Sequence, residues 1–182
     1  KGSKLIVATS AGEVNFFLGI KQLIFTDYPS HVLTTSSTGI KALQSADNET
    51  VTNNYLLPEN FFLIYIYFLI LKPSELIFIE HEVWPLYLLI AKMFKIKTVF
   101  IQAKAGVSTK TCNSSRFIKK LLVKFFFKFL YGFFDLIIPI NSKHAAIFRI
   151  LGNKKTQITE GFNFKLSVFQ ECDVKKDMKQ DV

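Results

Sequence analysis

Short apolar runs alternate with longer segments of helical periodicity along the chain. The apolar runs predict seven strands, at residues 5–9, 31–35, 50–56, 76–79, 98–102, 136–140 and 156–159. The segments between them predict six helices, at residues 13–25, 38–46, 60–71, 85–94, 115–134 and 142–151. Alternating strands and helices are typical of a doubly wound α/β fold with a mostly parallel sheet.

The organisation of the chain indicates one domain. We assign residues 1–170 to an α/β domain, because no internal repeat or low-complexity linker interrupts them. Residues 171–182 are polar and lack periodicity, so we expect a tail or the start of an interdomain linker there. The longest apolar run, 61–71, is shorter than the ~18–20 residues that cross a bilayer, and we expect it to form a buried helix.

Charge narrows the class of partner. The net charge of +9 favours an anionic partner, either nucleic acid, anionic lipid or a phosphorylated substrate. Nucleic acid ranks below the other two, because the basic residues alternate with aliphatic and phenylalanine side chains and no nucleic-acid motif is present. The two cysteines, Cys112 and Cys172, lack metal-site spacing and a disulfide framework, which favours a reducing compartment.

Ser10-Ala11-Gly12-Glu13 follows the first predicted strand and opens the first predicted helix. Ligands of open α/β sheets bind at the carboxyl ends of strands, so this turn is well placed for a site. Gly12 would allow a close backbone approach, and Glu13 lies in the first helical turn. From these four residues alone the stronger interpretation is structural, with Ser10 capping the helix and Glu13 complementing its dipole.

A second polar cluster, Glu80-His81-Glu82, follows the fourth predicted strand and precedes Trp84 and Pro85. The two carboxylates could share a proton, bind a cation or hold a sugar hydroxyl, and we expect at least one to be buried and hydrogen-bonded. Zinc is disfavoured, since the chain has only 3 histidines and no companion spacing. Taken alone, His81 reads as a structural residue.

A hydroxyl-rich turn, residues 34–39, follows the second predicted strand. It could cap the next helix or bind phosphate through backbone N–H groups. Capping is the better interpretation, and the turn has no lysine of the kind that a nucleoside triphosphate loop requires.

The predicted helix at 115–134 carries a basic ridge of residues spaced four apart: Arg116, Lys120, Lys124 and Lys128. The positions around the ridge are mostly Phe, Leu, Ile and Val, which suits a membrane interface. The alternative is an ordinary core helix with one solvated face. Under the interface interpretation, Phe125, Phe126 and Phe129 cannot all pack inside.

Taken in order, these segments resemble the N-terminal half of the Kdo (3-deoxy-D-manno-octulosonic acid) transferases. The family's Ser-x-Gly-Glu, its Thr-rich turn ending in Thr-Gly, its Tyr-x-Pro-like segment and its Glu-x-Glu-x-Trp-Pro are matched here by Ser10, Gly12, Glu13, Thr34, Thr35, Thr38, Gly39, Tyr55, Pro58, Glu80, Glu82, Trp84 and Pro85. The last of these motifs is the strongest match.

The later motifs match with departures. Gln102 and Lys104 stand where the family has Asn and Arg, and a lysine cannot reproduce a bidentate arginine contact. The family's next run is matched by Ser108 and Lys110, and its closing Gly-Asn-Leu-Lys by Asn163 and Lys165, with Phe162 replacing the glycine.

The resemblance implies the Rossmann-like N-terminal half of a GT-B glycosyltransferase. Such enzymes transfer Kdo from CMP-Kdo to a lipid A precursor in lipopolysaccharide biosynthesis, with inversion and without a cofactor or metal. Glu13 would be the general base. The implied substrate-binding residues are Ser10, Gly12, Thr35, Thr38, Gly39, Glu80, Glu82, Lys104, Ser108, Lys110, Asn163 and Lys165.

The resemblance also implies a location and leaves two alternatives open. We expect the chain at the cytoplasmic face of the inner membrane of a Gram-negative bacterium, peripheral or anchored by an upstream segment, with no nucleic acid as partner. We expect the C-terminal donor domain to be absent from this chain, and these residues alone to be inactive. The alternatives are a non-catalytic module that binds anionic lipid at the membrane, and a GT-B glycosyltransferase of another specificity.

Overall fold

The computed structural model describes residues 2–24, 29–46, 51–55, 59–106 and 117–161. The described strands are β1 (Lys4–Val7), β2 (Ser30–Thr34), β3 (Val51–Tyr55), β4 (Glu75–Ile79), β5 (Lys97–Ala103), β6 (Leu136–Pro139) and β7 (Gln157–Ile158). The described helices are α1 (Ala11–Ile24), α2 (Ser37–Ser45), α3 (Phe61–Leu71), α4 (Pro85–Met93), α5 (Phe117–Tyr131) and α6 (Ser142–Leu151).

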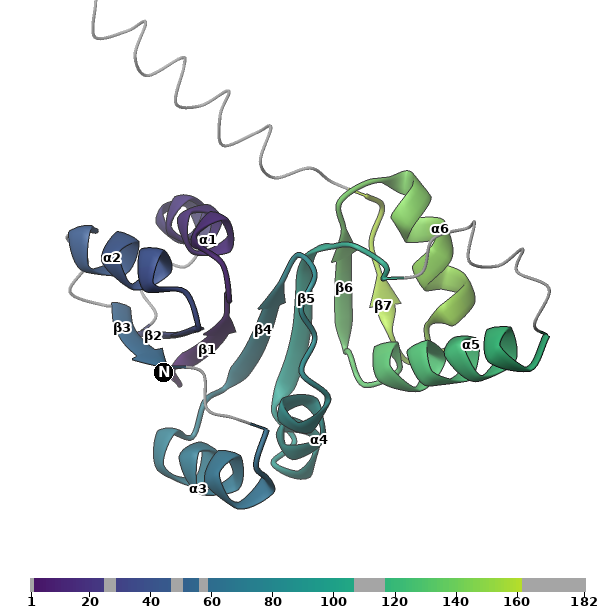
Figure 1. Ribbon diagram of the computed structural model, residues 1–182, viewed down its shortest axis with the longest axis horizontal. Coiled ribbons are helices and arrows are strands. Elements are labelled where there is room, and N and C mark those ends of the chain that lie inside the picture. Colours follow the sequence, from purple (N-terminus) through teal and green to yellow (C-terminus); the bar gives the residue numbers. More distant parts are fainter. Residues whose placement is uncertain (1, 25–28, 47–50, 56–58, 107–116, 162–182) are drawn as a thin grey trace, which may run out of the picture.

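The strands form one sheet in the order β3-β2-β1-β4-β5-β6-β7, and every pair of neighbours is parallel. The chain builds outward from β1 to β3, then crosses back to β4 on the other side of β1. Right-handed crossovers therefore put α1 and α2 on one face and the later helices on the opposite face (Figure 1). The predicted doubly wound parallel fold is confirmed.

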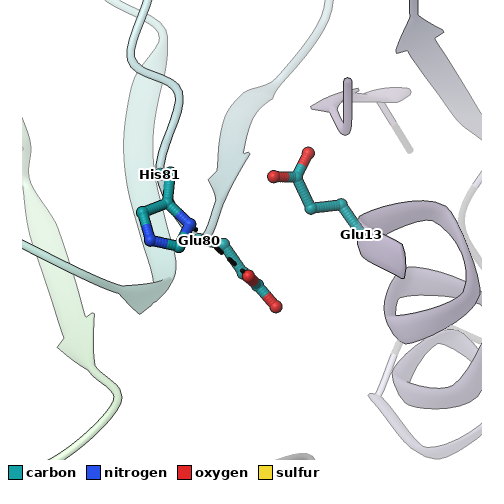
Figure 2. Close-up of side chains that lie close together, drawn as sticks. All are labelled: Glu13, Glu80 and His81. Atoms are coloured by element: carbon teal, nitrogen blue, oxygen red, sulfur yellow. Dashed lines mark ion pairs between the residues drawn. The ribbon is translucent and has the colours of Figure 1, made fainter. Parts of the chain in front are cut away.

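The reversal of strand order creates a switch point between β1 and β4, which is where open α/β sheets bind ligands. The turn after β1 leads into α1 and brings Glu13 to this edge. The turn after β4 brings Glu80 and His81 to the same edge (Figure 2). The two segments that the sequence singles out therefore meet.

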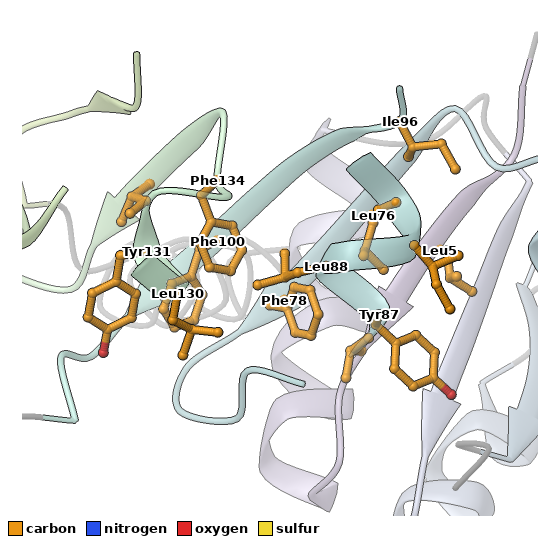
Figure 3. Close-up of a cluster of buried hydrophobic side chains, with 14 of the residues drawn as sticks. Leu5, Leu76, Phe78, Tyr87, Leu88, Ile96, Phe100, Leu130, Tyr131 and Phe134 are labelled. Carbon is orange, nitrogen blue, oxygen red and sulfur yellow. The ribbon is translucent and has the colours of Figure 1, made fainter. Parts of the chain in front are cut away.

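Consecutive residues of the central strands enter opposite cores. Leu5 and Val7 join the cluster under α3 to α6, whereas Ile6 and Ala8 join the cluster under α1 and α2. This explains why the strands are apolar at successive positions instead of alternating. The larger cluster is rich in aromatic rings, drawn in part in Figure 3.

Helices α2, α3 and α4 begin at the site edge of the sheet, and the first two are capped by side chains. Ser36 Oγ accepts a hydrogen bond from the Gly39 N–H at 3.2 Å, so the capping interpretation of the hydroxyl-rich turn is confirmed. Asn60 caps α3 through the Leu63 N–H, and α4 begins with Pro85 at its first position.

The expectation that residues 61–71 form a buried helix is wrong. Helix α3 is present, but among its side chains only Ile64 and Phe68 are fully buried. Phe62 is 73% exposed and Ile70 78% exposed. The reason is geometric, since a helix that covers a sheet as a single layer can bury only one stripe of its surface. Within the described residues, no helix is both long and apolar enough to cross a bilayer.

Candidate functional site

Glu13 is a buried acidic side chain at the site edge of the sheet. Its side chain is buried, and its Oε2 accepts hydrogen bonds from the Thr9 N–H at 2.7 Å, the Thr9 hydroxyl at 3.1 Å and the Ser10 N–H at 3.2 Å. The Glu13 N–H in turn donates to Ser10 Oγ at 3.3 Å. This reciprocal bonding is a capping box, so the structural interpretation of the turn is confirmed. The same bonds fix the orientation of the carboxylate.

The environment of Glu13 raises its affinity for a proton. Burial raises the pKa of Glu13 above its ordinary value of 4.5, while the hydrogen bonds from Ser10 and Thr9 oppose the rise. The carboxylate of Glu80 adds to the rise, because two negative charges at close range disfavour each other. Glu13 is therefore a stronger proton acceptor than an ordinary surface carboxylate, which is what a general base needs.

Glu80 faces Glu13 from the end of β4. Its backbone is left-handed, with φ 62°, and this conformation is held by the Glu80 N–H bonding the Ile101 carbonyl at 3.1 Å and the Lys104 N–H bonding the Glu80 carbonyl at 2.9 Å. Its Oε2 lies 3.2 Å from Lys104 Nζ and 3.5 Å from His81 Nδ1. The expectation that at least one of Glu80 and Glu82 is buried and bonded is confirmed by Glu80.

One oxygen each from Glu13 and Glu80 and one ring nitrogen of His81 lie within 4.8 Å of one another. Figure 2 shows Glu13 reaching from α1 toward the other two. That spacing could hold a cation, but Lys104 already places an ammonium on Glu80 and Glu13 Oε2 is saturated by three donors. We therefore assign no metal here. The arrangement can accept a proton at Glu13 and bind a hydroxyl between the two carboxylates.

Comparison with protein families identifies the chain. Residues 3–168 match the family described as 3-deoxy-D-manno-octulosonic-acid transferase (kdotransferase). The chain belongs to the Kdo transferase family. No curated protein matches it.

Solved structures agree with this family assignment at the level of fold. The UDP-N-acetylglucosamine 2-epimerase of Rickettsia bellii superposes with a TM-score of 0.61 at 13% identity, over 96% of this chain and 48% of that chain. MnaA of S. aureus, solved with UDP, gives 0.60 at 10% identity over 93% and 46%. MurG of Acinetobacter baumannii gives 0.51 at 13% over 89% and 44%. The chain thus spans about half the length of these structures.

The other residues implied by the Kdo transferase motifs lie around the same edge. Thr35 Oγ1 donates to the Thr9 carbonyl at 3.2 Å, and Thr38 is exposed beside Ser36. A Cβ on Gly39 would lie 2.9 Å from Thr34 Oγ1, so this glycine serves the packing of α2. A Cβ on Gly12 would make only an ordinary contact with Ser10 Oγ at 3.9 Å, and Gly12 is exposed at the start of α1.

Glu82 is exposed, and Trp84 packs at the margin of the larger core. Five predicted residues lie outside the described residues, namely Ser108, Lys110, Arg116, Asn163 and Lys165. The side chain of Lys120 on α5 is outside the described part as well.

The described end of α5 exposes its phenylalanines, as the membrane-interface interpretation requires. Phe125, Phe126 and Phe129 are 65%, 53% and 67% exposed, so none packs against the sheet. Lys124 and Lys128 are exposed beside them.

Sequence reasoning missed His144, which lies in the first turn of α6 at the same edge. Its Nδ1 accepts the Ala105 N–H at 3.0 Å and thereby holds the loop that carries Lys104. Burial lowers the pKa of His144 below 6.5, and the charges of Lys104 and His81 lower it further. Its position after the sixth predicted strand, at the carboxyl edge, was the signal available.

Proposed function

We propose that the chain is the acceptor-binding half of an inverting glycosyltransferase that moves Kdo from CMP-Kdo to a hydroxyl of a lipid A precursor. The family match supports the reaction class, and the Glu13 site supports the mechanism. The donor would be held by a second domain beyond these residues, so this chain alone should not turn over. Neither a cofactor nor a metal takes part in the proposal.

The geometry of Glu13 carries the proposal. Thr9 and Ser10 donate to Oε2, while Oε1 receives no hydrogen bond from the described residues. That second oxygen can accept the hydrogen of an acceptor hydroxyl that lies within about 2.6–3.2 Å. The position is suitable because Glu13 and Glu80 line the switch point of the sheet, where the cleft of a two-domain enzyme of this fold opens.

The proposed step transfers one proton and exchanges one C–O bond. Glu13 takes the proton as the acceptor oxygen forms a bond to the anomeric carbon of Kdo. The bond from that carbon to the phosphate oxygen of CMP breaks, and its electrons leave with CMP. Attack opposite the leaving group inverts the configuration, and the protonated carboxyl of Glu13 is stabilised by the burial that raises its pKa.

The remaining motif residues are proposed to bind the acceptor around Glu13. Glu80 and Thr35 would orient sugar hydroxyls, and Lys104 would meet a negative group of the substrate while it balances Glu80. The further candidates are Ser10, Gly12, Thr38, Gly39, Glu82, Ser108, Lys110, Asn163 and Lys165.

We also propose that the chain works at the cytoplasmic surface of the inner membrane. The exposed phenylalanines and lysines of α5 support this location, because aromatic rings and cations suit the headgroup region of an anionic bilayer. The charge contribution can be tested with Lys120→Gln/Lys124→Gln/Lys128→Gln. This variant should bind anionic vesicles more weakly and neutral vesicles as the wild type does.

The catalytic proposal is tested in a chain that joins these residues to a donor-binding half. With CMP-Kdo and a lipid A precursor, Glu13→Gln should lower turnover by roughly 10²–10⁴-fold while acceptor binding is retained. Glu75→Gln is the matched control, since Glu75 begins β4 at the opposite, amino edge of the sheet and should leave turnover unchanged. Turnover of Glu13→Gln at the wild-type rate would return Glu13 to a purely structural role.

A second candidate function is a non-catalytic module that binds anionic lipid. The observation that favours it is the exposed apolar surface of α3 and α5, which is independent of Glu13. Lipid binding by the joined chain without any Kdo transfer would select this candidate.

A further inference from the structure

Helix α3 carries an exposed apolar surface that the reaction does not use. All 11 of its residues are apolar or tyrosine, with no charged side chain. Five of its six large exposed side chains form a stripe three and four residues apart, comprising Phe62, Leu63, Ile66, Leu69 and Ile70, and Phe61 lies beside it. The opposite side of the helix is anchored, because Ile64 and Phe68 are buried in the core and Tyr65 and Phe68 contact Phe94. Such a stripe on one helix exceeds the scattered apolar residues of ordinary protein surfaces.

The neighbouring helix α4 adds apolar side chains of its own. Leu89 and Met93, one turn apart, are 41% and 54% exposed. Helices α3, α4 and α5 all pack on the same face of the sheet, in the larger core cluster (Figure 1). The α3 stripe is therefore part of a broader apolar side of the molecule.

The charges around this surface are mostly positive. Two acidic side chains lie near it and each has a partner, since Glu59 accepts the Leu86 N–H and Asp135 pairs with Lys92 of α4. Residues 60–74 contain no Asp or Glu, and residues 83–134 contain ten Lys or Arg and no Asp or Glu. Lys72 at the end of α3 and Lys95 after α4 are exposed. An apolar stripe bordered mainly by cations matches the chemistry of an anionic lipid surface, with acyl chains below phosphate groups.

A second copy of the chain fits this surface less well. A two-fold dimer brings the same patch of each copy together, so the exposed Lys72 and Lys95 of one copy would face a patch that carries the same two positive charges. Like charges repel across such an interface, whereas anionic headgroups would neutralise them.

The position of α3 relates the surface to the site. Asn60 caps the helix at the carboxyl edge of the sheet, and the preceding Glu59 accepts the Leu86 N–H at 3.2 Å. Leu86 lies in the first turn of α4, just after the segment of Glu80 and Trp84. The apolar helix, about 16 Å long, thus starts beside the candidate site.

We propose that α3 is an interfacial helix that lies in the surface of an anionic phospholipid bilayer, with Phe62, Ile66 and Ile70 among the acyl chains. This gives the membrane association proposed above its apolar anchor, separate from the lysines of α5, and it does not depend on Kdo transfer. Seated this way, the site edge lies at the headgroup level, where the sugar of a membrane-bound acceptor is presented.

The proposal is tested by the binding of the 182-residue chain to vesicles of phosphatidylcholine with and without phosphatidylglycerol. Phe62→Gln/Ile66→Gln/Ile70→Gln should weaken partitioning to both vesicle types by roughly 100-fold. The lysine variant of α5 should weaken binding to the vesicles that contain phosphatidylglycerol and leave binding to the neutral vesicles unchanged. The apolar and the charge contributions are therefore measured separately. Single Ile70→Gln should weaken binding by roughly fivefold. Its matched control is Ile150→Gln, because Ile150 on α6 is 66% exposed. The control variant should bind vesicles as the wild type does.

Wild-type binding by the triple variant overturns the proposal. The proposal is also overturned if the wild type sediments as a dimer, the triple variant sediments as a monomer and both bind vesicles equally. In that case the surface is covered by a second copy of the chain. Phe62→Trp gives a readout that does not depend on the fold of the triple variant. Its added fluorescence should be quenched by lipids brominated near the headgroup, and absence of quenching counts against the proposal.

Discussion

The ion pair between Lys104 and Glu80 offers a quantitative test of how the site edge is held. Replacing Lys104 with methionine keeps much of the side-chain volume and removes the ammonium that lies 3.2 Å from Glu80 Oε2. The Glu80 side chain is 10% exposed and that of Lys104 27% exposed, so the remaining carboxylate loses its cation where water reaches it poorly. His81 is a second partner of Glu80, but its side chain is 57% exposed and balances the charge only when protonated.

The expected loss of stability lies between two limits. Breaking a fully buried pair costs about 3–5 kcal/mol, and losing an exposed pair costs about 0–1 kcal/mol. This pair is mostly but not fully buried, so Lys104→Met should lower the free energy of unfolding by about 2 kcal/mol. The double variant Lys104→Met/Glu80→Gln should recover most of that loss, because no unpaired charge remains.

The assay is urea unfolding followed by circular dichroism at pH 7, for the wild type, both single variants and the double variant. The coupling energy of the cycle should be about 1.5 kcal/mol and should persist in high salt, since buried pairs are weakly screened. Equal stability of Lys104→Met and the double variant would refute the reasoning. It would mean that the lysine stem, and not its charge, supports the edge.

Three further predictions concern pH. Burial alone would raise the pKa of Asp135, but hydrogen bonds from Lys92 and Thr98 and the charge of Lys92 hold it below 3.8. The ionised carboxylate therefore stabilises the fold at neutral pH, and this contribution is lost as the pH falls through the lowered pKa. In urea unfolding, Asp135→Asn should cost about 1–2 kcal/mol at pH 7 and progressively less as the pH falls below 3.8. The raised pKa of Glu13 reverses the sign, since its contribution is lost as pH rises; Glu13→Gln should therefore gain stability relative to the wild type between pH 4 and pH 7 in the same assay. The pKa of His144 is lowered, so NMR should find its ring titrating below 6.5, with the Ala105 amide shifting at the same midpoint as their hydrogen bond breaks; an Ala105 amide insensitive to pH would contradict that contact.

The fold was predictable because local pattern and global architecture agree. Each predicted strand and helix is present within a few residues of its expected bounds, and the alternation of strands with helices correctly indicated a doubly wound sheet with helices on both faces. The exposure of α3 was not predictable. A helix that is apolar all round gives no indication of which stripe faces the sheet, or whether anything else covers the rest.

The site was predictable only in part. Sequence order placed Glu13 and the Glu80 segment at strand ends, and parallel strands bring such ends together. It did not tell which of Glu80 and Glu82 turns inward, because that depends on the left-handed backbone of Glu80 and its bonds to β5. The contact of His144 with Ala105 joins residues 39 apart, which no local pattern encodes.

The central claim is that Glu13 is the base of a Kdo transfer reaction, and the dependence of kcat/KM on pH tests it most directly. In a chain joined to a donor-binding half, the wild-type rate should fall on the acid side with a midpoint above 4.5, the ordinary pKa that burial raises in Glu13. In Glu13→Gln the residual rate should lack that acid limb. An identical acid limb in the variant and the wild type would contradict the account.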